Sequence, residues 1–389
     1  MKKLINVSCL ILTALLITTC FSPWRGDDNN LTIVWGQGTN SRLYYQKDFG
    51  DDINVFWVTI KGPGTTIEQQ FKDVSGAAFS LSPGIWNVSV KGGYIRYDYP
   101  GLEYDVPNLY SVMGVEQIEI KAGQKTKADI QMYNAKEVHS WEELYDTIDV
   151  NANGFTDFTN CAEPTCPNYG SPHVHEQIVV LKSGEPYAAG EYEIDSAWYG
   201  SGWITIKRPV TLIAEDPITI TRRDGFHDTF FEINWDCLTL GKPGMTGTIT
   251  IDGRSNINSS ESLEVPGVPG FTSPLISVNG PESTGVKGEL VMYDGVTLRN
   301  NIAQIGGAVC VLPEAVFTMY GGRITGNTAV GFPETSGGVG GNEKARGGGV
   351  YVGLDTISYK SLGTFNQLGG TVSGNKPDNI FRERETPLL

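Results

Sequence analysis

Apolar and polar residues alternate along the first part of the chain with the two-residue period of a β-strand. The alternation is clearest in segments 55–60, 85–90 and 115–120. Glycine and proline separate these runs, as in Ser82-Pro83-Gly84. Short strands at this spacing, with no helical pattern among them, are typical of a small antiparallel sandwich. We therefore expect a β-sandwich over residues 31–134.

One helical pattern follows this segment. Ser140 and Glu143 have the spacing of a capping box. An apolar face results from the i, i+3, i+4, i+7 spacing of Trp141, Leu144, Tyr145 and Ile148. Such a helix could bind a partner, but the open end of a β-structure also needs a cover for its backbone edges and apolar interior. We interpret the helix as a cap on the β-structure that follows it.

From about residue 176 onward the pattern is one of short strands and turns, and it repeats. Segment 317–327 returns as 365–375, with Gly-Gly and Gly-Asn at identical offsets, and 290–300 is a looser copy. Gly306–Val311 is echoed by Gly347–Val352. Farther upstream, 248–253 has the shape of 290–295, since both end in Asp-Gly. Each copy consists of a strand, a corner that contains glycine, and a second strand.

A single copy of this repeat cannot bury its own apolar side chains, whereas stacked copies bury a continuous column. Asparagine recurs at the corners, at Asn300, Asn327 and Asn375. Amide side chains at repeated positions can hydrogen-bond from one coil to the next, so we expect them to form a ladder. The repeats therefore predict a capped parallel β-helix over residues 136–389.

These repeats resemble the Gly-Gly-x-Ile-Ser-Gly-Asn coils of bacterial surface proteins with a right-handed, pectin-lyase-like β-helix. Segment 79–90, in which a Pro-Gly turn leads into a core strand, resembles the transthyretin-like sandwich modules of surface proteins. The two resemblances imply an all-β chain, with an N-terminal sandwich followed by a right-handed parallel β-helix.

The N-terminus has the features of an export signal. Lys2 and Lys3 precede an uncharged stretch rich in Leu and Ile over residues 4–19. Leu16-Ile17-Thr18-Thr19-Cys20 resembles a bacterial lipobox, which implies a diacylglycerol lipid on Cys20. The predicted organisation is then a lipoprotein-type signal peptide over 1–20 and a polar tether over 21–30. A cleaved secretory signal or an uncleaved anchor is the alternative. We expect export and a lipid anchor in the outer membrane or cell surface.

Composition narrows the range of partners. The chain has 389 residues, 48 of them glycine, and a formal charge of −15. Abundant glycine with ordinary apolar content indicates many turns in a globular chain. The negative charge, with no basic stripe, argues against binding to nucleic acid. The only membrane contact we expect is through the lipid, and no cofactor is indicated.

Four cysteines follow Cys20. Cys161 and Cys166 enclose a short loop containing proline, and we expect a disulfide between them in an oxidising compartment. His173 and His175 follow, and zinc would accept this set of ligand types, but the spacing matches no familiar zinc finger. We therefore expect no metal. The remaining two, Cys237 and Cys310, lie in apolar strands and are interpreted as buried thiols.

Pectin-lyase-like folds include polysaccharide lyases and glycoside hydrolases. Such enzymes use carboxylates, either as a catalytic pair or as ligands of a metal. Asp252 and Asp294 occupy matching strand ends in the proposed repeat, so we expect them on one edge, with Arg254 or Arg222 nearby. The next copy has Gly321 in place of Asp294, which favours a role for Asp-Gly in the turn. The motifs of polygalacturonases and pectate lyases are absent from the sequence. We assign no catalytic residues; a polysaccharide-active enzyme, using Asp252, Asp294 and Arg254, is the alternative.

Two groups of aromatic residues could stack on the apolar faces of sugars. One contains Trp198, Tyr199 and Trp203; the other lies in a loop-rich stretch and contains Tyr94, Tyr97, Tyr99, Tyr104 and Tyr110. Packing within strands is the alternative role for such residues. The loops at 254–274 and 328–346 could border a binding face. The sequence favours a lipid-anchored surface-exposed binding or adhesion protein for a glycan or matrix surface, with a purely structural spacer as a further alternative.

Overall fold

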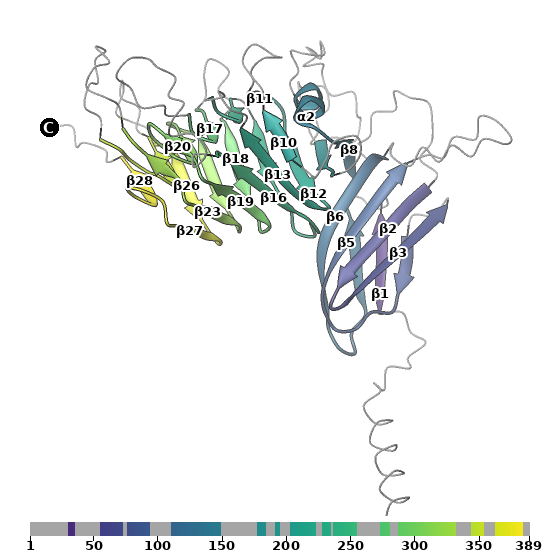
Figure 1. Cartoon of the computed structure of the whole chain (residues 1–389). Coiled ribbons are helices and arrows are strands. Elements are labelled where there is room, and N and C mark those ends of the chain that lie inside the picture. The colour runs from purple at the N-terminus through teal and green to yellow at the C-terminus, as the bar shows by residue number, and fades with distance from the viewer. Residues whose placement is uncertain are drawn as a thin grey trace, which may run out of the picture.

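The structure is a computed structural model, and the part of the chain that it describes consists of β-strands apart from one helix (Figure 1). It describes residues 30–35, 55–72, 76–93, 110–148, 177–183, 191–194, 203–222, 228–234, 236–254, 273–280, 287–331, 344–353 and 362–383.

Two facing sheets form an N-terminal unit. One sheet has the order β4-β1-β7, and the strands β3-β2-β5-β6 form the end of a longer sheet. The bounds are β1 (Leu31–Trp35), β2 (Val55–Gly62), β3 (Thr65–Lys72), β4 (Gly76–Phe79), β5 (Gly84–Gly93), β6 (Tyr110–Ile120) and β7 (Thr126–Ile130). Alternate residues of both sheets form one core, in which Trp35, Val58, Trp86 and Ile130 are almost fully buried.

The pairing in this unit departs from the antiparallel arrangement that the sequence predicted. β1 pairs antiparallel with β4 but parallel with β7, with Leu31 opposite Thr126. Period-two alternation shows which face of a strand is buried but carries no information about strand direction. The side chain of Asn30, directly before β1, binds the connection between β4 and β5, since it donates to Leu81 O at 2.7 Å and accepts from Leu81 N at 2.8 Å.

Strand β8 (Tyr133–Val138) connects the N-terminal unit to the rest of the chain. It pairs antiparallel with β6 and parallel with β9 (Gln177–Leu181). The two parts of the chain therefore share one sheet of 11 strands, in the order β26-β22-β18-β15-β12-β9-β8-β6-β5-β2-β3. The boundary predicted at 134–136 falls inside β8.

Beyond β8 the strands pass in turn through three long parallel sheets, an arrangement compatible with a parallel β-helix. We call residues 177–383 the coiled region and one passage through the three sheets a coil. The first sheet contains β9, β12 (Val210–Ala214), β15 (Cys237–Leu240), β18 (Glu289–Met292), β22 (Val316–Met319) and β26 (Thr364–Gln367). The second contains β10 (Glu191–Ile194), β13 (Pro217–Arg222), β16 (Thr248–Asp252), β19 (Val296–Arg299), β23 (Arg323–Thr325) and β27 (Thr371–Ser373).

The third sheet contains β11 (Ile204–Ile206), β14 (Phe231–Ile233), β17 (Ile276–Val278), β21 (Val309–Val311), β25 (Val350–Val352) and β28 (Ile380–Arg382). Two coils add a short strand, β20 (Ile302–Ala303) and β24 (Thr328–Ala329), which pair with each other. Figure 1 shows the coils stacked from β10, beside the helix, to β28 near the C-terminus.

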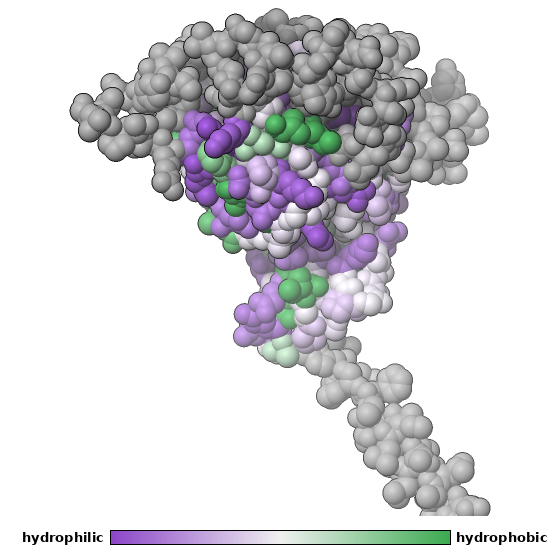
Figure 2. Space-filling view, turned by 60° about the vertical axis from the view of Figure 1, so that its left-hand side comes forward, coloured by the Kyte–Doolittle hydropathy of each residue, from purple (hydrophilic) through white to green (hydrophobic). Residues whose placement is uncertain are grey.

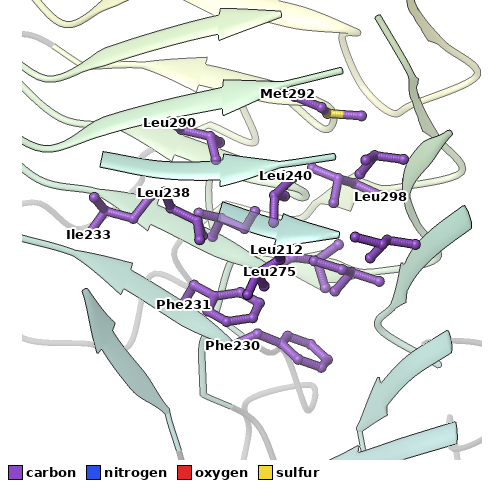
Figure 3. Packing of buried hydrophobic residues seen from close by; sticks show 14 of the residues in the cluster. Leu212, Phe230, Phe231, Ile233, Leu238, Leu240, Leu275, Leu290, Met292 and Leu298 are labelled. Carbon is purple, nitrogen blue, oxygen red and sulfur yellow. The ribbon is translucent and has the colours of Figure 1, made fainter. Parts of the chain in front are cut away.

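Side chains at equivalent positions of successive coils form columns inside the coiled region. In the first sheet Leu238, Leu290, Phe317 and Phe365 lie in register. Figure 3 shows part of this interior, with Leu290 and Met292 following Leu238 and Leu240. The rings of Phe317 and Phe365 stack with centroids 4.8 Å apart. Each coil thus buries the apolar surface of the previous one, and the stacked coils bury the continuous column that the repeats predicted.

The helix α2 (Trp141–Ile148) covers the first coil. Its N-terminus has the predicted capping residue, because Ser140 Oγ accepts a hydrogen bond from Glu143 N at 3.1 Å. Trp141 packs edge-on against the rings of Phe230 and Phe231. At the other end of the helix, the guanidinium of Arg208 donates to Thr147 O, one of the carbonyls that the helix itself leaves unpaired.

The register confirms most of the repeats found in the sequence and corrects one. Phe317 lies opposite Phe365, Leu290 opposite Phe317, and Val309 opposite Val350. However, segment 248–253 is not equivalent to 290–295, because Ile249 pairs with Val296. The two segments look alike because Asp-Gly occurs at two different corners of the coil.

The asparagine ladder is present, but its first member is Asn301 and not the predicted Asn300. Asn301, Asn327 and Asn375, called the Asn ladder below, are linked in order: Asn327 Oδ1 accepts from Asn301 N, and Asn375 Oδ1 accepts from Asn327 N, at 3.1 and 3.0 Å. Asn300 instead occupies a left-handed conformation, with φ of 54°. Glycine takes this position in the later coils, at Gly326 and Gly374, and asparagine tolerates it better than most residues.

Candidate functional site

Most of the side chains predicted to have a functional role lie outside the described residues. This applies to the lipidation candidate, the expected disulfide with its neighbouring histidines, and all but one of the glycan-binding candidates: Cys20, Cys161, Cys166, His173, His175, Tyr94, Tyr97, Tyr99, Tyr104, Trp198 and Tyr199. The side chain of Tyr110, at the start of β6, is also outside them. Trp203 is described, and it is half-buried directly before β11. These assignments remain predictions.

The structure separates the two carboxylates that were expected on one edge. Asp252 ends β16 and lies opposite Arg299, at the C-terminal end of the second sheet. Asp294 lies in the corner that precedes β19, at the other end of the same sheet, where it accepts a hydrogen bond from Gly322 N at 3.0 Å. The expectation that they stack is therefore wrong, since it depended on the incorrect equivalence of their segments.

Asp252 belongs to a network of charged and amide groups. Its Oδ1 accepts from Arg254 N at 2.9 Å, and its Oδ2 accepts from Arg299 Nε at 2.7 Å and Asn300 Nδ2 at 3.1 Å. Arg254 in turn pairs with Glu193 through Nη1 at 2.8 Å. Both oxygens of Asp252 are thus engaged in holding the corner. A general acid or nucleophile needs a carboxyl that is free to meet a substrate, whereas the oxygens of Asp252 are bonded to neighbouring residues of the protein.

Arg222, the other basic candidate, is packed inside the protein. Its side chain is almost completely buried, donates through Nη2 to Ser273 O at 3.0 Å, and lies 4.9 Å from the centroid of the Phe230 ring. Burial lowers the pKa of Arg222 to about 9. Its contacts link the end of β13 to the residues that precede β14 and β17.

A pocket of about 300 Å³ opens where the N-terminal unit meets the coiled region. We call it the junction pocket. Its lining combines one acidic residue, one lysine, two threonines, a proline and a tyrosine: Glu116, Lys242, Thr211, Thr239, Pro243 and Tyr293. Ligand pockets tend to occur at such junctions between structural units.

Different elements supply the walls of the junction pocket. Glu116 comes from β6, whereas Thr211 and Thr239 are paired neighbours on the outer face of β12 and β15. Lys242 and Pro243 belong to the turn between β15 and β16, and the Lys242 ammonium lies 4.2 Å from the centroid of the Tyr133 ring. The pocket is therefore complete only when the two parts of the chain are packed together.

The turn that carries Lys242 is docked closely on β6. Gly244 in this turn has φ of 94°, and a Cβ atom built there would lie 2.6 Å from Glu116 O. A glycine is needed here for both reasons, because other residues rarely adopt this conformation and none has room for a side chain. The close approach sets the position of Lys242 and Pro243 relative to Glu116.

A row of large side chains, of which the first is half-buried and the others are exposed, continues from the pocket along one corner of the coils. The rings of Tyr293 and Tyr320 are stacked with centroids 5.1 Å apart and an interplanar angle of 10°. The ring of Tyr320 is 48% exposed, and Leu368, at the same position of the next coil, is 66% exposed. We call Tyr293, Tyr320 and Leu368 the corner row.

The corner row was missed at the level of sequence, although a signal for it exists. Both tyrosines stand directly before the corner, in Tyr293-Asp294-Gly295 and Tyr320-Gly321-Gly322. Met292 and Met319 face the interior, so the tyrosine that follows each of them lies on the outer face by the alternation of the strand. Strand aromatics are packing residues at inward-facing positions, so the position of each tyrosine relative to the corner distinguishes these two from core residues.

One face of the molecule offers little extended apolar area among the described residues. On the face shown in Figure 2, hydrophobic residues form small separate patches among hydrophilic ones. Within the described residues, no three His, Cys, Asp or Glu side chains are grouped to hold a metal. No helix in this part of the chain is long and apolar enough to cross a membrane.

Comparison with protein-family models, curated proteins and solved structures finds no match to this chain.

Proposed function

We propose that this chain is an exported protein, held at the outer membrane or cell surface by a lipid on Cys20, that binds a glycan without turning it over. In this proposal the N-terminal unit is a transthyretin-like sandwich and the coiled region a right-handed, pectin-lyase-like β-helix. The observation that carries the binding role is the junction pocket, which opens beside the two stacked tyrosines of the corner row.

The composition of the site supports a glycan over other ligands. A sugar presents an apolar face that packs on an aromatic ring and a rim of hydroxyls that pairs with polar groups. Tyr293 supplies a ring, Thr239 supplies a hydroxyl, and Glu116 and Lys242 supply groups of opposite charge. The charge of −15 opposes binding to polyanions, which favours neutral glycans.

The binding role is tested by incubating the mature chain, residues 21–389, with immobilised neutral and acidic polysaccharides and measuring both retention and new chain ends. We expect retention on at least one neutral polysaccharide and no new ends, with divalent ions present. Retention on none of them would refute the binding role. New ends would replace it with the enzymatic alternative, and Asp252→Asn and Arg254→Ala would then be the first variants to assay.

The anchor is tested separately on protein expressed from the full-length sequence in a bacterial host. We expect mass spectrometry of the N-terminal peptide to show a diacylglycerol group on Cys20. Replacement by Cys20→Ser should release the protein from the membrane fraction. A wild-type protein cleaved elsewhere, or carrying no lipid, would contradict the anchor and leave the binding role unaffected.

A further inference from the structure

The corner row has an equivalent position in the preceding coil, and that position is a glycine. Tyr320 N donates to Met292 O, and Leu368 N donates to Met319 O, so each corner residue is bonded to the coil before it. Tyr293 N donates to Leu240 O in the same way, and Gly241 N donates to Leu212 O. Gly241 therefore stands where the row would have its next side chain.

The junction pocket lies beside this position. Lys242 and Pro243 directly follow Gly241, and Tyr293 both lines the pocket and stacks on Tyr320. Gly241 adds no side chain to the corner row, so its stack ends at Tyr293, which lines the space of the pocket. At about 300 Å³ the space is at the lower end of the range of ligand pockets, which suits one small ring.

We propose that a single neutral pyranose unit binds in the junction pocket with its apolar face on Tyr293, as the rung of the corner row that Gly241 omits. This assignment rests on the proposed glycan-binding function and gives it a site and a ligand class. The rise from one coil to the next is about 4.8 Å, and the two tyrosine rings are 5.1 Å apart. A sugar ring placed one step farther continues this spacing.

The polar lining suits the hydroxyl rim of such a ring. Thr239 presents a hydroxyl that lies 3.6 Å from Cys237 Sγ and can both donate and accept, whereas its neighbour Thr211 is buried. Glu116 accepts and Lys242 donates, so the charged groups at the pocket oppose each other in sign. A neutral ring bearing several hydroxyls matches this set, whereas a uronic acid would place its carboxylate near Glu116.

The test uses the mature chain and methyl glycosides of glucose, galactose, mannose, N-acetylglucosamine and glucuronic acid as probes. Binding is measured by isothermal titration and by saturation-transfer NMR. We expect at least one neutral glycoside to bind and to receive saturation on the hydrogens of its apolar face. Tyr293→Ala should weaken binding about tenfold, because the ring contact is lost. Tyr293→Phe keeps the ring and should stay within about threefold of wild type.

Two further variants distinguish loss of a contact in the pocket from loss of the folded structure. Thr239→Val preserves shape while removing one hydroxyl, so it should weaken binding without altering thermal unfolding; it serves if Tyr293→Ala is unstable. Ile85→Ala, at an exposed position on β5, is the matched control and should bind as wild type does. Unchanged affinity in Tyr293→Ala and Thr239→Val would overturn the pocket assignment, as would a preference for glucuronic acid.

Failure of this site can be told apart from failure of the function. If wild type and Tyr293→Ala are retained equally on a polysaccharide, the protein binds glycans elsewhere, and only the pocket assignment fails. If wild type is retained on no polysaccharide and binds no glycoside, both proposals fail.

Discussion

At the scale of single residues, the Asn ladder shows how a buried polar side chain can join coils. Asn327 is fully buried, and its Nδ2 lies within hydrogen-bonding distance of Leu298 O, Thr325 O and Asn375 Oδ1. Its Oδ1 accepts from Asn301 N. Buried amides with this degree of satisfaction specify one arrangement of the coils, because any shift leaves several groups unpaired.

We predict that Asn327→Ala lowers the free energy of unfolding by about 3 kcal/mol, since it leaves buried groups such as Asn301 N without their acceptor. The free energy is measured by urea denaturation followed by circular dichroism. Asn366→Ala, on the exposed outer face of β26, is the control and should change stability by less than about 0.5 kcal/mol. Equal effects of the two substitutions would mean that the ladder contributes nothing beyond ordinary side-chain contacts.

The two cysteines of the coiled region should differ in reactivity. Neither Cys237 nor Cys310 is in a disulfide. Burial raises the pKa of the Cys310 thiol to about 12, helped by the nearby charge of Glu383. The thiolate is the reactive form, so we predict that iodoacetamide at pH 8 alkylates half-buried Cys237 well before Cys310. Peptide mass spectrometry of the native protein gives both rates. Faster modification of Cys310 would contradict the burial of β21.

At the level of residues, the sequence predicted a ladder of asparagine side chains but assigned one of its members to the wrong asparagine. The repeat of Gly-Asn pointed to an amide ladder, and Asn327 and Asn375 are part of it. Asn300 was assigned to it because it aligned by chain offset, whereas hydrogen bonding selects Asn301. Sequence alone could not distinguish them, since asparagine serves both as a ladder residue and as a substitute for glycine in the left-handed conformation.

At the scale of elements, α2 could be predicted almost completely. The capping residue Ser140 and the apolar spacing are local signals, and the helix begins and ends where they indicate. One detail differs: Glu143 Oε2 accepts from His139 N at 2.8 Å instead of from the backbone of Ser140. Strand directions and partners were harder, as β1 and β7 show, because pairing between distant segments leaves no local pattern.

We predict that Trp141→Ala destabilises the protein by about 3 to 5 kcal/mol, because a large aromatic side chain is removed from the core. Trp141 is 5% exposed and covers the rings of Phe230 and Phe231 at the first coil. Trp141→Phe keeps part of this cover and should cost less than half as much. The free energies of unfolding of the two variants are compared with wild type. Equal costs would show that α2 packs loosely on the coil.

At the scale of the whole molecule, one sheet runs from the N-terminal unit into the coiled region through β8. The sequence predicted two separate units, because the change from alternating strands to repeats looks like a domain boundary. It gave no sign of their shared sheet or of the junction pocket. Both depend on contacts between segments far apart in the chain, such as Glu116 with the turn at Gly244.

Four charged side chains meet at this junction, and we call them the junction ion cluster. Glu215 lies 2.5 Å from both Lys91 and Lys182, whereas Glu137 lies 3.4 Å from Lys91 and 3.8 Å from Lys182. The side chain of Glu137 is only 4% exposed. The cluster links β5 and β8 of the N-terminal side to the coiled region, so its protonation is coupled to the packing of the two parts.

The protein changes the pKa values of Glu137 and Glu215, the two carboxyls of the cluster, in opposite directions. Burial raises the pKa of Glu137 above its usual range, and its longer contacts with Lys91 and Lys182 offset this only in part. Burial would also raise the pKa of Glu215, but its short contacts with the two lysines outweigh burial and lower it. Folding therefore favours protonated Glu137 and ionised Glu215.

These directions predict how stability depends on pH. The stabilisation that comes from the raised pKa of Glu137 is fully present below the unfolded pKa of about 4.5. It is lost as pH rises through the raised folded pKa. The stabilisation that comes from the lowered pKa of Glu215 is present above about pH 4.5 and is lost as pH falls through the lowered folded pKa. At pH 7, Glu215→Gln should cost about 2 kcal/mol because two lysines lose their closest partner, and Glu137→Gln should cost less.

The measurement is the difference in unfolding free energy between each variant and wild type from pH 3 to pH 8, which removes the background from other carboxyls. The cost of Glu215→Gln should shrink as pH falls below about 4.5, since the wild-type residue is then protonated as well. The difference for Glu137→Gln should instead change above about pH 4.5, becoming more favourable to the variant as pH rises. Equal, pH-independent costs would mean that the cluster is solvated and does not hold the two parts of the chain together.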